Sequence, residues 1–437
     1  METPVIVPAD VAFMLVATAL VLLMTPALAF FYGGLVRSKN ALNTMMMSVS
    51  ALGFVGVAWA LLGYSLSFAE GGPLVGDLSK AFLNGVGLDP VAPVTIPQLL
   101  FMCYQGTFAI ITAALISGAI VERMRFAPYL VFITLWSLVV YGPIAHWVWG
   151  GGFLAKLGAL DFAGGTVVHV NAATAALVAA LVLGKRKDYA RQAILPHNVP
   201  FVLLGAGLLW FGWFGFNAGS ALAANGIASL AFTNTMLAPA ATLLVWTLLD
   251  LFRSGKATAV GAATAIVVGL VAVTPAAGFV SPLGGIALGA IAAVPSYFAI
   301  LFRARTGLDD SLDVIAAHGV GGTVGALLTG VFAIKAWNGV ADGLVAGNPG
   351  QVGTQAIAVL ATIVYSGIAS YLLLKLIGAV MSLKAVTKEE GLGMDFSQHG
   401  EEAYADGEGA ILVLQRPDST ASEGAGALAP AAQGGRS

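Results

Sequence analysis

The chain has 437 residues, of which 58% are hydrophobic and only 10% are charged, and its mean hydropathy is +0.89. Soluble proteins keep roughly a quarter of their residues charged, so this composition excludes a water-covered globular protein and indicates an integral membrane protein. The net charge of −2 argues against a nucleic-acid partner. The single cysteine, Cys103, excludes an internal disulfide and a cysteine metal site, and is expected to pack in the core.

A helix needs about 20 apolar residues to cross the hydrocarbon core of a bilayer. The first such run follows the acidic residues Glu2 and Asp10 and lacks a basic leader, so we expect a retained helix rather than a cleaved signal peptide. The sequence predicts an all-α integral membrane protein with eleven transmembrane helices, the eighth being the shortest. Their expected ranges are 10–33, 41–66, 97–121, 126–147, 162–183, 199–217, 228–250, 258–274, 283–302, 313–333 and 355–383.

The basic residues predict the orientation of these helices. Seventeen of the 20 lysines and arginines lie in alternate short loops, at the end of the last helix or in the tail, while only Lys80, Lys156 and Lys335 lie in the other loops. Cytoplasmic loops carry the excess of basic residues, so we expect the N-terminus outside and the C-terminus in the cytoplasm. This alternation requires an odd number of helices, which supports eleven.

The expected domains are a transmembrane domain at 1–384 and a cytoplasmic tail at 385–437. The first domain divides into a repeat at about 10–184, a second at about 198–334 and a final long helix at about 355–384. The tail is polar up to Tyr404, and from about 405 its Gly, Ala, Ser and Pro content predicts disorder.

Two histidines occupy matching positions in these repeats. Asp161 precedes His169 by eight residues, Asp310 precedes His318 by eight, and the offset between the pairs is 149 residues in both cases. Five helices per repeat require the second copy, helices 6–10, to be inverted relative to helices 1–5. Eight residues of helix place each histidine ~12 Å past its aspartate, near the middle of a core ~30 Å thick. We therefore expect both histidines at a midplane site, as in transporters built from inverted repeats.

The aspartates have a simpler interpretation. Asp161 stands just before a Gly-Gly-Thr helix start, so helix capping or shaping of the site is favoured over proton carriage for Asp161 and Asp310. A metal enzyme built on the two histidines and two aspartates is disfavoured, because no second histidine lies three or four residues from His169 or His318.

Aromatic residues beside small residues mark the expected outer ends of several helices. Such residues commonly form the aromatic belt at a membrane interface, but the neighbouring glycines indicate close backbone approach, which a belt does not need. Ring faces together with a hydroxyl acceptor suit a small monovalent cation that donates hydrogen bonds. Acidic rings, which a divalent ion would need, are absent from these sequence segments. The segments are 104–108, 146–152 and 213–220.

From about residue 10 to residue 404, the sequence closely resembles the bacterial ammonium transporters of the ammonium transporter/methylammonium permease/Rhesus family. The motifs that carry this resemblance are FYGG at 31–34, YQGTF at 104–108, AHWVWGGG at 145–152, DFAGGTVVH at 161–169, GWFGFNAGS at 212–220, VTP at 273–275 and DSLDVIAAHG at 310–319. The resemblance implies a homotrimer in the cell membrane, with one pore per subunit, that carries ammonium and is not an enzyme. It implies no cofactor and no metal, and it leaves methylammonium open as a further substrate.

The resemblance also assigns roles to individual residues. It places Phe108, Trp149 and Ser220 at an outer ammonium-recruitment site, with Tyr104, Asp161 and Thr274 nearby. Phe108 and Phe216 match the stacked gate of phenyl rings. His169 and His318 match the twin pore histidines, and Phe31 is expected to line the pore. Tyr104 departs from the phenylalanine that relatives usually carry, so its hydroxyl either adds an acceptor to the recruitment site or reaches water.

These roles imply a transport mechanism. Ammonium would bind among the rings, lose its proton there and pass as ammonia through an apolar pore, while the proton crosses by a separate route and makes transport electrogenic. The segment 391–404 resembles the family's cytoplasmic tail, which couples subunits, and basic inner loops beside it would dock a PII-type regulatory protein. An ammonium sensor that signals through a bound cytoplasmic partner is the alternative function.

Overall fold

The fold was analysed in a computed structural model, which describes residues 5–90 and 93–404. Within these residues the protein is all-helical, with isolated bridges but no β-strand. The longer helices are α1 (Pro8–Leu35), α2 (Ala41–Ala58), α4 (Gln98–Ile116), α5 (Phe126–Trp136), α8 (Asn171–Leu183), α9 (Val199–Gly219), α10 (Gly226–Ser254), α11 (Ala259–Val273), α12 (Pro282–Arg303), α13 (Gly321–Phe332) and α15 (Gly350–Val380).

Shorter helices extend or connect these. They are α3 (Tyr64–Phe68), α6 (Gly142–Val148), α7 (Phe153–Leu157), α14 (Lys335–Asn338), α16 (Thr387–Leu392) and α17 (Met394–His399). π-Helical turns at Trp59–Gly63 and Ser137–Tyr141 join α2 to α3 and α5 to α6 into continuous apolar rods.

Each of the eleven expected membrane spans overlaps an apolar helix of the structure. Among the described residues, ten helices are long and apolar enough to cross a membrane, and α11, which has 15 residues, is the shorter apolar helix. It corresponds to the expected range 258–274, the shortest predicted run. The last of the expected spans corresponds to α15, which begins at Gly350 rather than at 355 and ends at Val380 rather than at 383.

Side-chain caps set where several helices begin. The side chains of Asn198, Asn225, Thr258 and Ser281 each accept a hydrogen bond from a backbone N–H three residues later. Such caps satisfy donors that the first helical turn leaves unpaired. The four residues fix the N-termini of α9, α10, α11 and α12.

The most extensive helix–helix contact in the bundle joins α1 and α9, the first helices of the two expected repeats. Glycines of α9 allow this contact: a Cβ added at Gly215 would lie 2.6 Å from the Leu20 Cβ. Small residues let apolar helices approach closely and gain packing along their length. Met14, Val21, Ala206 and Leu209 on these two helices are buried there.

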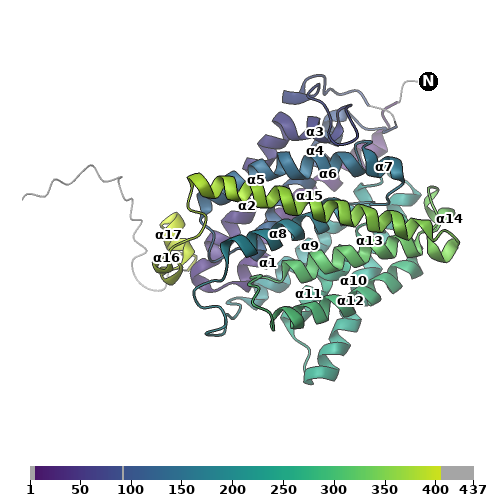
Figure 1. The fold of residues 1–437 in the computed structure, drawn as a ribbon. Coiled ribbons are helices and arrows are strands. Elements are labelled where there is room, and N and C mark those ends of the chain that lie inside the picture. Colours follow the sequence, from purple (N-terminus) through teal and green to yellow (C-terminus); the bar gives the residue numbers. More distant parts are fainter. Residues whose placement is uncertain (1–4, 91–92, 405–437) are drawn as a thin grey trace, which may run out of the picture.

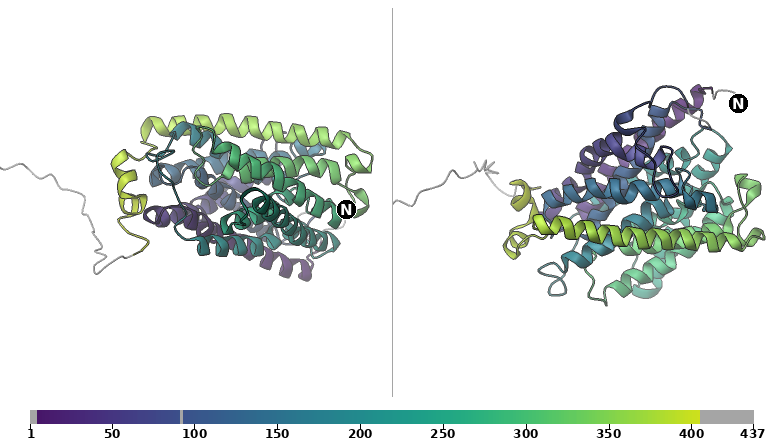
Figure 2. Two further views of the ribbon diagram at one scale, coloured as in Figure 1. Left: turned by 90° about the horizontal axis from the view of Figure 1, so that it is seen from below. Right: turned by 45° about the horizontal axis from the view of Figure 1, so that its top comes forward.

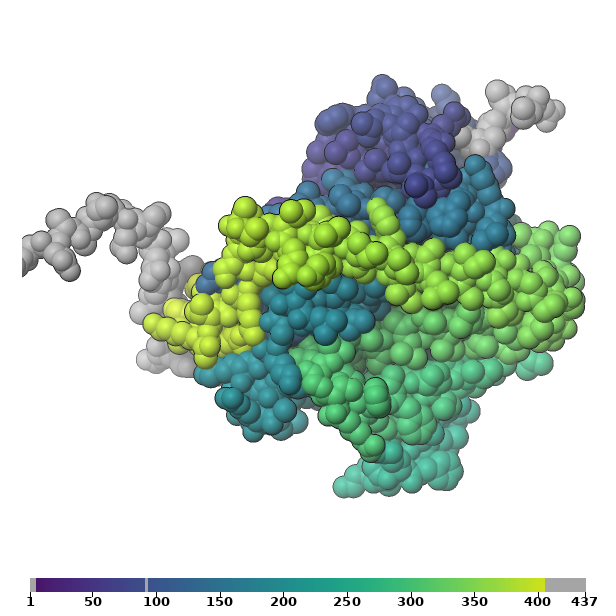
Figure 3. Space-filling model, in the orientation of Figure 1, coloured from purple at the N-terminus to yellow at the C-terminus, as the bar shows by residue number. Residues whose placement is uncertain are grey.

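The bundle has two distinct ends. In Figure 1, α16 and α17 lie at one end, while α7, α14 and the start of α1 lie at the other. The long helix α15 runs between the two ends along one side, against α5, α8 and α13 (Figure 2), and forms a yellow-green band on the surface in Figure 3. The end that carries α16 and α17 is called the tail end below.

Cys103 does not pack in the core. It lies exposed on the surface of α4, because the buried faces of that helix are occupied by larger residues such as Tyr104 and Phe108. The expectation that it fills a core position is wrong.

Candidate functional site

A cavity of about 290 Å3 opens near the end of the bundle opposite the tail; we call it the aromatic cavity. It is formed mainly by α4, the end of α6 and the end of α9. Its lining residues are Phe68, Phe101, Gln105, Phe108, Val148, Trp149, Phe162, Ser220 and Leu222. Three of the residues expected at a cation-recruitment site, Phe108, Trp149 and Ser220, therefore meet in one cavity. Phe108 and Trp149 lie edge to face, with ring centroids 6.0 Å apart.

The floor of the aromatic cavity is a pair of stacked phenyl rings. Phe108 and Phe216 have ring centroids 4.1 Å apart and an interplanar angle of 30°. Both side chains are about 1% exposed. Phe108 lines the aromatic cavity, and Phe216 lines the next cavity below it, so the ring pair separates the two.

The next cavity, called the histidine cavity, is narrow and almost wholly apolar. Its volume is about 10 Å3, close to the minimum that holds one water molecule. It is lined by Met24, Leu28, Phe31, Ile111, Leu115, Val168, His169, Leu209, Trp213, Phe216, Val267 and His318. Among the described residues, the two histidines are the only titratable groups that line it, and both are buried.

His169 and His318 face each other across the histidine cavity. Their Nδ1 atoms lie 3.2 Å apart. A hydrogen bond between two Nδ1 atoms requires the proton on one ring and the lone pair on the other. When both rings are neutral, one Nε2 then carries a proton and the other accepts one, so the pair offers both a donor and an acceptor. The Nε2 atom of His169 has no hydrogen-bond partner within the described residues.

Each histidine sits in a π-helical turn of six residues. His169 lies in Gly165–Val170, which leads into α8, and His318 lies in Ile315–Val320, which leads into α13. Such turns widen a helix by one residue and often occur at functional sites. Gly322 of α13 lies opposite His169: a Cβ added there would be 2.9 Å from the His169 Cβ. The turns and this glycine set the positions of the two rings.

Both aspartates cap the turns that carry the histidines. Asp161 accepts hydrogen bonds from the backbone N–H groups of Gly164, Gly165, Thr166 and Val167, and from the Thr166 hydroxyl. Asp310 accepts from the N–H groups of Val314 and Ile315. These contacts are those of helix caps. Neither aspartate lines the aromatic or the histidine cavity.

Asp161 is itself held by neighbouring helices. The amide of Gln355, on α15, accepts a hydrogen bond from Leu160 N at 2.8 Å and donates one to Leu160 O at 2.7 Å. The Trp149 indole donates to the carbonyl oxygen of Asp161 at 2.8 Å. One side of the aromatic cavity is therefore tied to the capping residue of the first histidine turn.

Tyr104 and Thr274 lie beside the cavities rather than in them. The Tyr104 side chain is fully buried, and its hydroxyl bonds to the carbonyl oxygens of Gly215 and Phe216 at 3.0 and 2.9 Å. The same hydroxyl lies 3.3 Å from Ser220 Oγ. Thr274 Oγ1 accepts a hydrogen bond from the Trp213 indole at 2.9 Å. Tyr104 therefore does not reach water, and Thr274 contacts the histidine cavity only through Trp213.

Sequence reasoning gave no site role to most residues that line these cavities, among them Trp213 and Gln105. Trp213 stacks on His169, with ring centroids 5.5 Å apart. Gln105 belongs to the aromatic cavity. Their signal was helical spacing. Trp213 lies three residues before Phe216 and seven before Ser220 at the end of α9, and Gln105 lies four residues after Phe101 and three before Phe108 on α4.

A third cavity, of about 190 Å3, lies on the tail side of His318. Phe31, Val267 and His318 line both this cavity and the histidine cavity, so the two adjoin. Arg303 and Asp313 also line it and form an ion pair. The three cavities thus follow one another along the bundle, and the histidine cavity is the narrowest.

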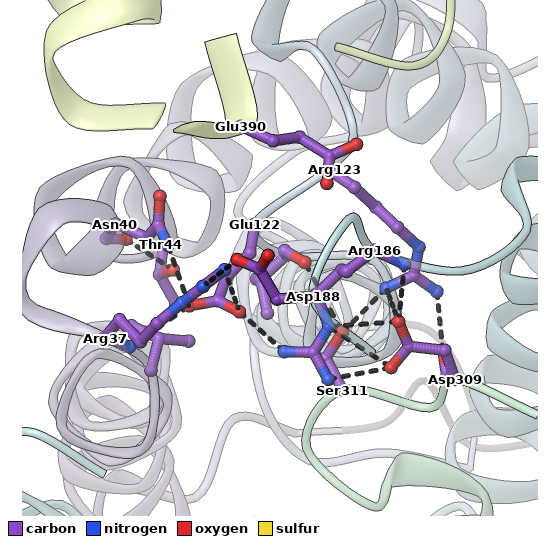
Figure 4. A network of polar contacts seen from close by, with 12 residues as sticks. Arg37, Asn40, Thr44, Glu122, Arg123, Arg186, Asp188, Asp309, Ser311 and Glu390 are labelled. Atoms are coloured by element: carbon purple, nitrogen blue, oxygen red, sulfur yellow. Dashed lines mark hydrogen bonds and ion pairs between the residues drawn. The ribbon is translucent and has the colours of Figure 1, made fainter. Parts of the chain in front are cut away.

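An ion-pair network lies at the tail end (Figure 4), and its Arg123 bonds Ser311, which lines the third cavity. Buried Glu122 pairs with Arg186 at 2.6 Å and with Arg37 at 3.0 Å, and Arg186 also pairs with Asp309 at 2.7 Å. Burial raises the pKa of Glu122, but the Arg186 and Arg37 guanidiniums outweigh it and hold the pKa below its ordinary value. Burial lowers the pKa of Arg123 to about 10, although Asp309 opposes this change.

The tail segment packs against the same end of the bundle. The Asp395 carboxylate accepts hydrogen bonds from Leu42 N at 3.0 Å and Asn43 N at 2.7 Å, and so caps α2 from outside that helix. Glu390 accepts from Lys187 N at 2.7 Å, and Glu389 pairs with Arg125 at 3.0 Å. The tail beyond 404, expected to be disordered, lies outside the described residues.

Within residues 5–90 and 93–404, no three His, Cys, Asp or Glu side chains are placed to hold a metal ion. Among the described residues, the donor set of the histidine cavity consists of two imidazoles, and no carboxylate lines the cavity. A zinc site would need three or four ligands. The arrangement instead suits the selection, desolvation and passage of a small solute.

Comparisons with known proteins find similar sequences and similar folds. Residues 12–404 match the sequence model of the Ammonium Transporter Family. An ammonium transporter from Aquifex aeolicus is 52% identical over 400 residues, which cover 90% of this chain and 93% of that protein. The crystal structure of Saccharomyces cerevisiae Mep2 superimposes with a TM-score of 0.81 at 37% identity, covering 86% of this chain and 89% of that one. A solved structure described as a sensor Amt protein has a TM-score of 0.82 at 29% identity, with coverage of 90% and 98%.

Proposed function

This chain belongs to the ammonium transporter family, and from that premise we propose that ammonium crosses the membrane through the three cavities described above. The observation that carries the proposal is the stacked pair Phe108 and Phe216, which separates an aromatic cavity from a narrow apolar one. A cation is favoured on the first side and disfavoured on the second. Ammonium is therefore expected to lose its proton at this ring pair.

The aromatic cavity recruits the cation. The ring faces of Phe108 and Trp149 attract a cation with about 0.5–2 kcal/mol each, depending on how far it is desolvated. Ser220 Oγ donates its proton to Phe216 O at 2.9 Å, so its lone pairs are free to accept an N–H of ammonium. The cavity has no carboxylate lining, which keeps binding weak enough for release.

The histidine cavity passes the neutral molecule. Moving an ammonium-sized ion into a dry medium costs of the order of 20 kcal/mol in the idealised limit, far more than the ring faces return. Desolvation lowers the pKa of ammonium and favours its deprotonation at the ring pair. Ammonia both donates and accepts hydrogen bonds, and His169 and His318 together offer it one acceptor and one donor. We assign the separate proton route, and hence net charge movement, to this histidine pair.

The orientation follows from the distribution of charge. We place the aromatic cavity outside the cell and the tail end in the cytoplasm, with eleven crossings, the second five inverted relative to the first. The matching π-helical turns of His169 and His318 support the inverted repeat. Homotrimer formation, and docking of a PII-type protein at the tail end, are proposed by analogy with the family. Chemical cross-linking of the purified protein tests the trimer.

A sensor function is the second candidate. It is favoured by the similarity to a protein described as a sensor Amt protein and by the tail segment 387–399, which contacts loops of the bundle. In this case the binding of a cytoplasmic partner depends on the conformation of the tail end. Transport measurements separate the two functions, because a sensor without transport leaves the internal pH of a vesicle unchanged when ammonium is added.

The experiment that tests the proposed function uses purified protein in proteoliposomes. We expect ammonium to produce a saturable change in internal pH, with a half-saturating concentration that Trp149→Leu raises about tenfold through loss of a desolvated cation–π contact. Trp147→Leu is the matched control: its indole donates to Leu74 O, and its side chain does not line the aromatic cavity. An equal effect of the two substitutions would contradict the recruitment site.

A further inference from the structure

The aromatic cavity contains one polar side chain that the proposed mechanism does not use. Gln105 lies on the same face of α4 as Phe101 and Phe108, since residues three and four apart on a helix are neighbours. Its side chain is about nine-tenths buried, with 9% of the residue exposed. An amide therefore interrupts an otherwise aromatic face that looks into the cavity.

The Gln105 amide is uncommitted, unlike the other polar groups of the cavity. Its Oε1 atom has no hydrogen-bond partner within residues 5–90 and 93–404. By contrast, the Trp149 indole donates to Asp161 O and the Ser220 hydroxyl donates to Phe216 O. A buried polar group without a partner is unfavourable, so such a group in a cavity is suited to a ligand.

We propose that the Gln105 side chain is a second hydrogen-bond acceptor for the recruited cation, beside Ser220. The inference rests on the proposed function. Ammonium carries four N–H groups, whereas the ring faces supply attraction to charge but no lone pair on a heteroatom. A half-turn about the Cγ–Cδ bond of Gln105 directs the amide oxygen toward the cavity.

The amide also decides which cations the site prefers. It adds an acceptor without adding a charge, so it strengthens binding of an N–H donor less than a carboxylate would and permits release. A quaternary ammonium ion carries the same charge but has no N–H group, so it gains only the ring-face attraction. The site consequently favours ammonium and protonated primary amines over quaternary ions.

The test measures half-saturation by ammonium in proteoliposomes containing the full chain. We expect Gln105→Leu to raise the half-saturating concentration about tenfold, as for a lost hydrogen bond to a charged group, with a smaller change in maximal rate. Gln98→Leu is the matched control, since Gln98 is a buried glutamine of the same helix that already bonds Tyr64 and does not line the cavity. Inhibition of ammonium transport by tetramethylammonium should be the same in Gln105→Leu and in the unsubstituted protein.

The outcomes separate the inference from the proposed function. If Gln105→Leu leaves half-saturation unchanged while Trp149→Leu raises it, the amide contacts only water and the inference is overturned. If neither substitution has an effect, the recruitment site itself is wrong. Should Gln105→Leu fail to fold, Gln105→Glu retains the shape and adds a charge. It is expected to lower the half-saturating concentration, and an unchanged value would overturn the inference.

Discussion

The Tyr104 hydroxyl donates a hydrogen bond to the carbonyl oxygen of Phe216, 2.9 Å away, and thereby ties α4 to the last turn of α9. The last carbonyls of a helix have no backbone partner within it, and this hydroxyl adds a second side-chain donor to one that the Ser220 hydroxyl also bonds. The same two helices carry Phe108 and Phe216. Tyr104 therefore fixes the position of the Phe108 ring on α4 relative to the Phe216 ring on α9.

The substitution Tyr104→Phe tests this relationship. It removes one oxygen and leaves the Gly215 carbonyl without its side-chain donor. We expect a loss of about 1–2 kcal/mol in the free energy of unfolding, seen as a lower thermal midpoint in detergent. Tyr371→Phe, at a residue that is 47% exposed, should leave the midpoint unchanged. Equal midpoints for the two variants would contradict a structural role of the Tyr104 hydroxyl.

Gly322 sets the space available to His169. A Cβ at this position would lie 2.9 Å from the His169 Cβ and 3.3 Å from Gly165 O, so Gly322→Ala must displace the histidine turn. We expect the maximal transport rate to fall at least tenfold, because a shift of about 1 Å is enough to disrupt a positioned pair. The half-saturating ammonium concentration, which the aromatic cavity sets, should change little. Gly53→Ala is the control, because no atom lies within 4 Å of its added Cβ.

The ion-pair network at the tail end should dominate the stability of that region. Glu122→Gln leaves Arg186 and Arg37 without their shared carboxylate, and breaking a buried pair in this way costs about 3–5 kcal/mol. Asp188→Asn, which removes only a partly exposed partner of Arg37, should cost about 1 kcal/mol or less. Thermal unfolding of both purified variants measures the difference. If Asp188→Asn lowered the stability as much as Glu122→Gln does, the conclusion that the buried Glu122 pairs contribute more than the Asp188 pair would be contradicted.

The same network predicts how stability depends on pH. The pKa values of Glu122 and Asp309 lie below their ordinary values of 4.5 and 3.8. A carboxyl group with a depressed pKa contributes its stability above its unfolded-state pKa and loses it as the pH falls toward the native one. The thermal midpoint should therefore be flat near neutral pH and fall below about pH 4.5. In Glu122→Gln the fall should be shallower, and an identical slope would exclude Glu122 as its source.

Asp395 should hold the tail segment in place. Because its carboxylate caps α2 through Leu42 N and Asn43 N, Asp395→Ala should cost about 0.5–2 kcal/mol and expose the segment 387–399. Hydrogen–deuterium exchange of that segment should become faster, while exchange in α8 stays slow. Glu401→Ala, at an exposed residue, is the control. Unchanged exchange in Asp395→Ala would mean that other contacts hold the tail.

Part of the candidate site was predictable from sequence because few polar residues occur in the membrane spans. The equal Asp–His spacings predicted that His169 and His318 lie at similar depth near the midplane, and in the structure their Nδ1 atoms are 3.2 Å apart. The aspartates were expected to cap helices, and both accept backbone N–H bonds there. A helix-capping residue depends on local chain geometry, which short sequence patterns encode well.

Other features depend on contacts between distant segments, which spacing within one segment does not encode. The basic loop residues Arg123 and Arg186 were expected at a cytoplasmic surface, yet the structure buries both. Arg123 pairs with Asp309, and Arg186 pairs with Glu122 and Asp309. Thr274 was expected beside the recruitment site, and its hydrogen bond from the Trp213 indole could not be predicted from spacing. The π-helical turns that present the histidines were also not predicted, because one inserted residue has no signature in a uniformly apolar sequence.

The most direct test of the proposed mechanism is the transient current that an ammonium pulse evokes from proteoliposomes with no other gradient imposed. We predict a saturable current for the unsubstituted protein, and its loss in the double variant His169→Ala/His318→Ala, whose thermal midpoint is measured in parallel to establish folding. An undiminished current in a folded double variant would contradict proton transfer by the histidine pair. A change in internal pH without any current in the unsubstituted protein would contradict net charge movement.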